Sequence, residues 1–231
     1  HTGEHVADLD LLDAGRFVLD LMPPSVIEVA GGRLDPARRR ALANWRPGPG
    51  VFKVDWALDR PIPWLDPLSA RSATVHLGGS AADIVDAEAA VMRGTIPERP
   101  FVLLSQPSLF DSSRAPAGKH TAWGYCHVPN GSTVDMTSAI EAQIERFAPG
   151  FSETIIGRAT ISPTQYQAHN PNYIGGDIGG GRFGLPKVLQ LGDERPFRVG
   201  TDVFLGSSAT PPGGGVHGMC GYLAAGAALR S

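Results

Sequence analysis

The sequence predicts an α+β fold, in which a mixed sheet with flanking helices forms one domain and smaller pieces of an α/β unit lie at the two ends. Alternating segments such as "VFKVDWAL" at residues 51–58 are typical of half-buried strands. Amphipathic helical patterns separate these segments irregularly. A short apolar run, a glycine-rich loop and an alanine-rich segment follow one another at residues 202–229.

The first elements are set by prolines and glycines. Residues 16–21 predict a strand, the Pro23-Pro24 pair a break, and residues 25–30 a short helix that ends at two glycines. Asp35 and Pro36 are typical of a helix start. In the strand that follows, the residues predicted to share one face are Phe52, Val54, Trp56 and Leu58.

The middle of the sequence predicts further strands at residues 74–77, 101–105 and 121–128. Ser80 is a good N-cap for a helix that ends at Gly94. A second helix is indicated by apolar residues at helical spacing, namely Met136, Ile140, Ile144 and Phe147. These stripes predict a packed core and not a cofactor site.

Composition excludes several classes of protein. The 231 residues are 42% hydrophobic and 19% charged, with a net charge of −3, so nucleic acid is not an expected partner. Cys126 and Cys220 lie far apart without ligand spacing, which predicts neither a metal site nor a disulfide framework. No signal peptide or long apolar span is found, so we expect a cytoplasmic protein and leave membrane association open.

The segment "DVFLGSSATPPGGGVHGMCGYLAAGAAL" has the order of a nucleotide site: strand, glycine loop, helix. Glycines allow a ligand to approach the main chain, and unpaired N–H groups at a helix start attract electron-rich groups. Gly213, Gly215 and Gly218 satisfy GxGxxG, but the acidic ribose ligand of an ordinary dinucleotide fold has no place after them. A tight turn that packs the last helix is an equally good interpretation.

A second glycine-rich stretch, "AHNPNYIGGDIGGG", occupies residues 168–181. Asn and Asp side chains close tight turns, so a surface loop is one interpretation. The other is a ligand-facing loop that supplies hydrogen bonds from Asn170, Asn172, Tyr173 and Asp177.

Five segments carry a resemblance to a known family: "VFKVDWALD", "RPFVLLSQPSLFDSSRAPAGKHTAWGYCHVPNGS", "IERFAPGF", "HNPNYIGGD" and "SSATPPGGGVHGMCGYLAA". In this order they resemble the phytoene desaturase-like FAD-dependent oxidoreductases, including the group named for a pyridine nucleotide-disulfide oxidoreductase domain. The resemblance extends over nearly the whole chain from Arg16 onward.

The resemblance implies the C-terminal half of a two-domain flavoprotein, because the GxGxxG unit that holds the ADP part of FAD in the family has no counterpart here. Residues 1–34 and 199–231 would then be pieces of the FAD-binding α/β domain, and residues 35–198 the substrate domain. The final strand, loop and helix would close over the flavin ring. The implied cofactor contacts are Ser207, Ser208, Thr210, Gly213, Gly214, Gly215, Val216, His217 and Met219.

Two functions follow. In the first, the chain is part of a dehydrogenase, desaturase or oxidase in which hydride passes from an apolar substrate to flavin N5. Its partner would be the N-terminal FAD-binding half, the catalytic residue is not identified, and the isolated chain would be inactive. In the second, it is a flavin-free module that binds an apolar ligand or acts as a scaffold. Homo-oligomerisation is open in both.

Overall fold

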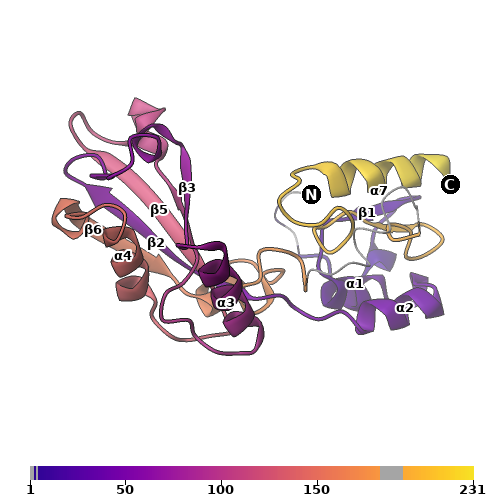
Figure 1. Cartoon of the computed structure of the whole chain (residues 1–231). Helices are drawn as coiled ribbons and strands as arrows, with labels where there is room; N and C mark the ends of the chain where they lie inside the picture. Colours follow the sequence, from indigo (N-terminus) through magenta and orange to yellow (C-terminus); the bar gives the residue numbers. More distant parts are fainter. Residues whose placement is uncertain (1–2, 4, 183–194) are drawn as a thin grey trace. The chain divides into compact units, whose positions relative to one another are not determined.

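The chain folds into two units, which Figure 1 shows in the computed structural model of residues 3, 5–182 and 195–231. Unit 1 is His1–Gly48 with Asp177–Ser231, and unit 2 is Pro49–Gly176. The borders predicted from the sequence lay at residues 34/35 and 198/199. The observed borders differ from the predicted ones for two reasons. The helix that begins at Pro36 packs beside the preceding helix, and Gly48 N–H bonds to Asp177.

Unit 2 is built on a five-stranded sheet with the order β3-β4-β5-β2-β6. The strands are β2 (Gly50–Leu58), β3 (Thr74–Leu77), β4 (Val102–Ser105), β5 (His120–Val128) and β6 (Ile155–Ile161). The α+β class is confirmed. The expected mixture of parallel and antiparallel neighbours in this sheet is wrong, since every pair is antiparallel. Strands alternating with helices suit either arrangement, so sequence order alone did not decide between them.

The core of unit 2 lies on one face of this sheet. Phe52, Val54, Trp56 and Leu58 of β2 are all buried on that face, which confirms the predicted register. Helix α4 (Thr137–Glu145) packs Ile140 and Ile144 against it. The ring of Trp56 meets Phe151 edge to face at 5.4 Å between centroids.

The other helices of unit 2 begin in capping boxes. At the start of α3 (Ala81–Met92), Ser80 and Asp83 exchange hydrogen bonds, and those from Ser80 lower the pKa of Asp83. Ser162 and Gln165 form the same arrangement at α5 (Pro163–His169). Helix α5 and strand β6 were not predicted from the sequence, although the S-x-x-Q spacing at residues 162–165 is a helix-start signal.

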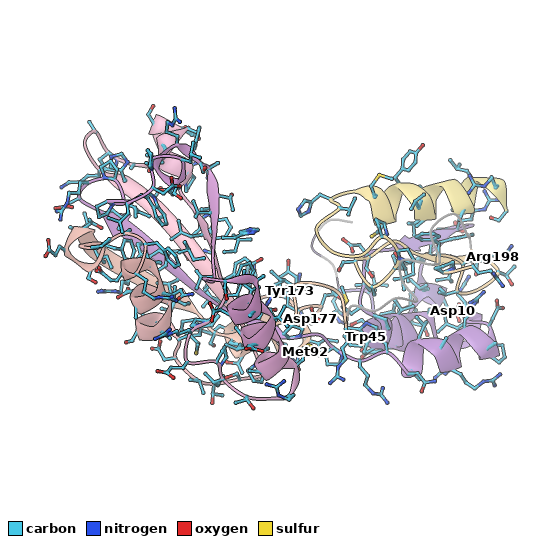
Figure 2. The ribbon with its side chains drawn as sticks, viewed as in Figure 1. Asp10, Trp45, Met92, Tyr173, Asp177 and Arg198 are labelled. Carbon is cyan, nitrogen blue, oxygen red and sulfur yellow. The ribbon has the colours of Figure 1, made fainter. Side chains whose placement is uncertain are left out.

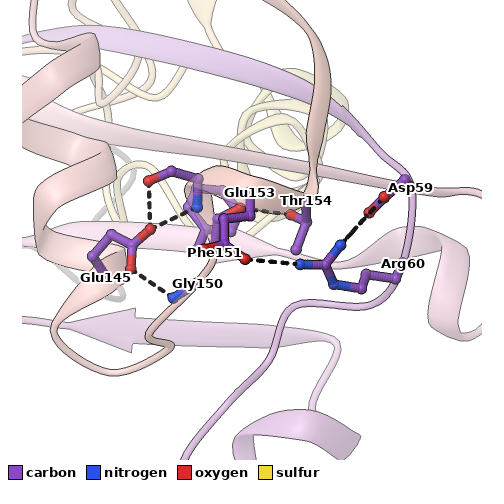
Figure 3. A network of polar contacts seen from close by, with 8 residues as sticks. Asp59, Arg60, Glu145, Gly150, Phe151, Glu153 and Thr154 are labelled. Atoms are coloured by element: carbon purple, nitrogen blue, oxygen red, sulfur yellow. Dashed lines mark hydrogen bonds and ion pairs between the residues drawn. The ribbon is translucent and has the colours of Figure 1, made fainter.

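The turn that follows α4 is held by a carboxylate, as Figure 3 shows. Glu145 accepts hydrogen bonds from the backbone N–H groups of Gly150 at 2.9 Å and Ser152 at 2.6 Å. Burial works to raise the pKa of Glu145, but these bonds and that from the Ser152 hydroxyl outweigh it, so the pKa lies below its usual value. The turn delivers the chain into β6.

Unit 1 contains a two-stranded parallel sheet, β1 (Phe17–Leu19) beside β7 (Val203–Leu205). Its described helices are α1 (Pro23–Ala30), α2 (Pro36–Ala43) and α7 (Met219–Arg230). The predicted break at Pro23-Pro24 is wrong, because both prolines occupy the first turn of α1, where a missing N–H removes no helical bond. All three residues of β7 are buried, and Phe204 packs against Ala224, Ala227 and Ala228 of α7.

Short 3-10 turns complete the described elements: Leu9–Leu11, Gly31–Arg33, Ser69–Arg71, Pro107–Leu109, Ser112–Arg114, Ser152–Thr154 and Ile174–Gly176. Among the described residues, no helix has the length and apolar character that crossing a membrane requires.

Candidate functional site

The predicted cofactor loop begins where β7 ends against α7. A side chain at Gly206 would meet the Ala224 methyl and the Gly221 backbone at 3.2 Å, so the small residue lets strand and helix approach closely. Ser207 and Thr210 are buried just beyond it. The Thr210 hydroxyl donates to the Ser207 carbonyl at 2.8 Å, so these two residues, predicted as cofactor contacts, form a turn of the loop.

The next part of the loop, residues 214–219, is exposed. Within the part of the chain that the structure describes, the backbone N–H groups of residues 214–218 have no hydrogen-bond partner, whereas Met219 N–H donates to Val216. Helix α7 starts at Gly218 without a side-chain cap. The loop therefore presents a row of free donors beside the positive end of a helix dipole.

Two glycines give this row its shape. Gly215 and Gly218 have φ values of +86° and +82°, which residues with side chains rarely adopt. A Cβ atom at either position would meet nothing within 4 Å, so a ligand can approach the main chain there. Gly213, by contrast, is buried, and its carbonyl lies 3.7 Å from the Cys220 sulfur.

Asp177, labelled in Figure 2, has a different role from the predicted one in substrate binding. Its side chain is only 3% exposed. Its two oxygens accept hydrogen bonds from Gly48 at 2.6 Å, Gly179 at 2.7 Å, Gly180 at 3.1 Å and Gly181 at 2.7 Å. The carboxylate thus closes its own loop, and we assign it to the fold.

The two glycine-rich loops of unit 1 lie side by side, which the sequence did not predict. A Cβ atom at Gly180 would fall 2.4 Å from the Ser208 backbone, and one at Gly214 would fall 3.0 Å from the Gly179 carbonyl. Trp45 supports the contact by donating its ring N–H to the Gly180 carbonyl at 3.3 Å. Residues 177–181 therefore buttress the exposed cofactor loop.

A cleft of about 510 Å³ opens in unit 1 beyond the carboxyl ends of β1 and β7. Ligands of open parallel sheets bind at these strand ends. The side chains that line it include apolar and cationic groups: Pro23, Arg38, Leu42, Trp45, Arg195, Val199, Leu205, Thr210 and Pro211. The predicted cofactor loop borders this cleft at Thr210 and Pro211, and residues 214–219 beyond them are exposed.

The remaining predicted substrate residues lie in unit 2. The Asn170 side-chain carbonyl accepts hydrogen bonds from the backbone and side chain of Asn172, at 3.0 and 3.3 Å. Tyr173 packs edge to face on Tyr166 of α5 at 6.0 Å. Tyr166 and the alternating aromatic side chains of β5 at residues 123, 125 and 127 were not among the predicted site residues.

His127 and Cys126 have neighbours that suit a structural role. His127 Nδ1 lies 2.7 Å from a carboxylate oxygen of Glu88, and burial raises the pKa of the Cys126 thiol to about 12, so this thiol is not poised to react. No cluster of three or more metal-binding side chains occurs among the described residues.

Known proteins resemble the chain in both sequence and fold. Pyridine nucleotide-disulfide oxidoreductase domain-containing protein 2 of Rattus norvegicus is 27% identical over 203 residues, covering 76% of this chain and 34% of the rat protein. A 4,4'-diapolycopen-4-al dehydrogenase of Metabacillus indicus is 28% identical over 133 residues, covering 52% of this chain and 26% of the dehydrogenase. No family model matches the sequence.

Among solved structures, a triple mutant of putrescine oxidase redesigned for cofactor binding shares the fold with a TM-score of 0.57. It is 14% identical, and the match covers 94% of this chain and 43% of the oxidase. The chain thus shares a fold with this oxidase, and it is similar in sequence to an oxidoreductase-domain protein and to a dehydrogenase. More particularly, the chain is similar in sequence to a member of the group named for a pyridine nucleotide-disulfide oxidoreductase domain, and the resemblance predicted from the sequence is confirmed. It spans about a third or less of the two curated relatives.

Proposed function

We propose that the chain is the C-terminal portion of an FAD-dependent oxidoreductase and that residues 213–219 contact the flavin ring. The observation that carries this proposal is the row of unpartnered N–H groups at residues 214–218 in front of the uncapped α7. A flavin ring presents carbonyl oxygens and a ring nitrogen that accept such bonds, and the helix dipole favours the negative charge of the reduced ring.

The residues present fit this cofactor. Gly215 and Gly218 leave the main chain uncovered, and the neighbouring loop keeps Gly214 in place through its contact with Gly179. FAD, when bound, accepts hydride from an apolar substrate. The chain itself would orient the ring and stabilise its charge, while the adenosine and pyrophosphate would be held by an N-terminal half supplied in the complete enzyme.

Nuclear magnetic resonance with riboflavin tests this proposal on the isolated chain. We expect riboflavin at millimolar concentration to shift the amide signals of residues 214–218, even though the chain alone does not retain FAD through purification. Gly215→Val should abolish these shifts, because its side chain would stand where the ring approaches.

Gly94→Val is the matched control. Gly94 has a φ of +84° and open space around it, so the substitution introduces the same backbone strain in unit 2. Unchanged riboflavin shifts in this variant would support the proposal. Absence of any shift at residues 214–218 in the native chain would overturn it and favour the flavin-free module.

A further inference from the structure

Strand β3 lies at one edge of the five-stranded sheet of unit 2, and β4 is its partner strand (Figure 1). Just before β3, the Gln106 N–H donates to the Ala73 carbonyl at 2.9 Å. Hydrogen-bonded pairs alternate in an antiparallel ladder, so the N–H and C=O groups of Thr74 and His76 point away from β4. Among the described residues these groups have no hydrogen-bond partner. Strand β3 therefore has a free edge.

A cavity of about 290 Å³ lies along this free edge. Its lining includes the consecutive strand residues Val75, His76 and Leu77. Side chains alternate between the two faces of a strand, so consecutive residues line one cavity only where the main chain itself borders it. The cavity is therefore open to the free N–H and C=O groups of His76, and we call it the β3 groove.

The walls of the β3 groove are largely apolar. They include the rings of Trp64 and Phe147 and the side chain of Ile84 from α3. Leu65, which also lines the groove, is 71% exposed, and Leu68 of the same loop is 64% exposed. Exposed large apolar side chains beside an apolar cavity are typical of a surface that another protein covers.

One carboxylate lines the β3 groove. Asp66 accepts hydrogen bonds from the hydroxyl and the backbone N–H of Ser69, at 2.8 and 2.9 Å. These bonds, first that from the hydroxyl, hold the pKa of Asp66 below its usual value, so the group is ionised at neutral pH. Asp66 forms no ion pair within the part of the chain that the structure describes. The charge of the groove thus favours a cationic group on whatever fills it.

We propose that the β3 groove binds an extended segment of another protein, which adds a strand to the free edge of β3. This segment places a large apolar side chain against Trp64 and Phe147 and a Lys or Arg side chain near Asp66. It runs antiparallel to β3, as do all neighbouring strands of this sheet. A second copy of the chain fits less well, because its own Thr74–Leu77 contains no Lys or Arg. The binding does not depend on the proposed flavin function.

The test uses the full chain and the peptide acetyl-Thr-Val-Thr-Leu-Thr-Lys-amide. In an extended peptide the Val, Leu and Lys side chains share one face. We expect nuclear magnetic resonance to show shifts of the amide signals of residues 74–79 and of the Trp64 indole. No shift there, or shifts confined to the other edge strand, β6, would overturn the proposal.

Two modified peptides separate main-chain from charge recognition. In antiparallel pairing with the apolar face inward, the threonine N–H groups of the peptide donate to β3. N-methylation of the two inner threonines should therefore weaken binding about tenfold. Replacement of the peptide Lys by Glu should weaken it about fivefold. Equal affinity for all three peptides would overturn the proposal, as would a dimer of the chain, detected by sedimentation, that the first peptide dissociates.

Variants of the chain make the test specific. His76→Pro removes a free N–H without removing a bond to β4, and Leu65→Ala removes an exposed side chain of the groove. Each should weaken binding of the first peptide about fivefold. Ile156→Ala, at a residue of β6 that is 58% exposed, is the matched control and should change nothing.

Asp66→Asn keeps an acceptor for the turn and removes the charge. It should bring the affinities of the Lys and Glu peptides to within about twofold of each other, and an undiminished preference for Lys would overturn the role of Asp66. Circular dichroism checks that each variant is folded. Because no flavin is present, a failure here leaves the riboflavin result at residues 214–218 unaffected, and the converse also holds.

Discussion

The two units of this chain bury their strands in different ways. In unit 2, five antiparallel strands share one apolar core, which lies between a single face of the sheet and α4. In unit 1, β7 is fully buried while Val18 in its parallel neighbour β1 remains 48% exposed. Parallel strands are usually covered on both faces and belong to larger sheets. Unit 2 thus has one large apolar core, whereas the described part of unit 1 has two smaller ones. We therefore expect unit 1 to depend more on individual polar contacts and close glycine approaches.

The strongest test of this difference is Trp56→Ala in unit 2. Trp56 is 2% exposed, packs on Phe151 and donates its ring N–H to Glu141 at 2.9 Å. Its loss should lower the free energy of unfolding of unit 2 by about 4 kcal/mol, because a large cavity forms in the shared core. Hydrogen exchange would report faster exchange in β2 and β5 and unchanged protection in α7.

Trp123→Ala is the control for this variant, since Trp123 projects from the neighbouring strand toward the opposite, half-exposed face. Trp123→Ala should lower the free energy of unfolding of unit 2 by about 1 kcal/mol. Equal losses of unfolding free energy in the two variants would mean that the second face of the sheet also contributes a core. Faster hydrogen exchange in α7 of the Trp56→Ala variant would mean that the two units do not unfold separately.

The sequence predicted the regular parts of both units because their signals are local. Alternation at residues 52–58 fixed the register of β2, and Ser80 marked the start of α3. Strand β6 was missed since only two of its seven residues, Ile155 and Ile161, are large apolar residues at the spacing of one strand face. The direction of strand pairing depends on contacts between distant segments, which local patterns do not contain.

A second test concerns the polar contacts of unit 1. Asp177→Ala removes the acceptor of four backbone N–H groups in a buried loop. We expect local destabilisation of residues 177–181 by about 2 kcal/mol, since buried donors without partners are costly. Hydrogen exchange at Gly179, Gly180 and Gly181 measures this effect.

Asp66→Ala is the matched control in unit 2. Asp66 is exposed and accepts backbone bonds from Leu68 at 3.2 Å and Ser69 at 2.9 Å, so its loss should have an effect well below that of Asp177. If Asp66→Ala is as damaging as Asp177→Ala, unit 1 is no more dependent on single polar groups than unit 2 is.

The sequence predicted which residue types form the candidate site, but not the contacts that bring them together. The glycine spacing at residues 213–218 indicated a ligand loop, and its exposed N–H groups agree with that interpretation. The approach of Gly180 to Ser208 and the bond from Gly48 to Asp177 join segments that lie far apart in the sequence. Asp is equally suited to bind a ligand or to close a turn, so residue type alone did not distinguish the two roles.

A smaller effect is expected from the capping box of α3. Ser80→Ala should lower the free energy of unfolding of unit 2 by about 1 kcal/mol, since Ser80 accepts from Asp83 N–H and supports the Asp83 carboxylate. Chemical denaturation measures the loss. Ser162→Ala removes the corresponding serine at α5 and should give a similar value if both helices belong to the same cooperative unit. A loss for Ser80→Ala alone would place α5 outside that unit.

The smallest expected effect is a pH dependence that belongs to unit 2 alone. Because the folded pKa of Glu145 is below its unfolded value, its carboxylate stabilises unit 2 fully above about pH 5, and this stabilisation is lost as the pH falls through the folded pKa. The contribution is about 0.5 kcal/mol after allowance for solvent screening of a partly exposed group. Glu145→Gln should therefore lower stability at pH 7 by roughly this amount and leave it nearly unchanged at pH 3, in denaturant titrations followed by tryptophan fluorescence. Equal destabilisation by Glu145→Gln at both pH values would show that the turn at residues 150–152 depends on the geometry of the side chain and not on its charge.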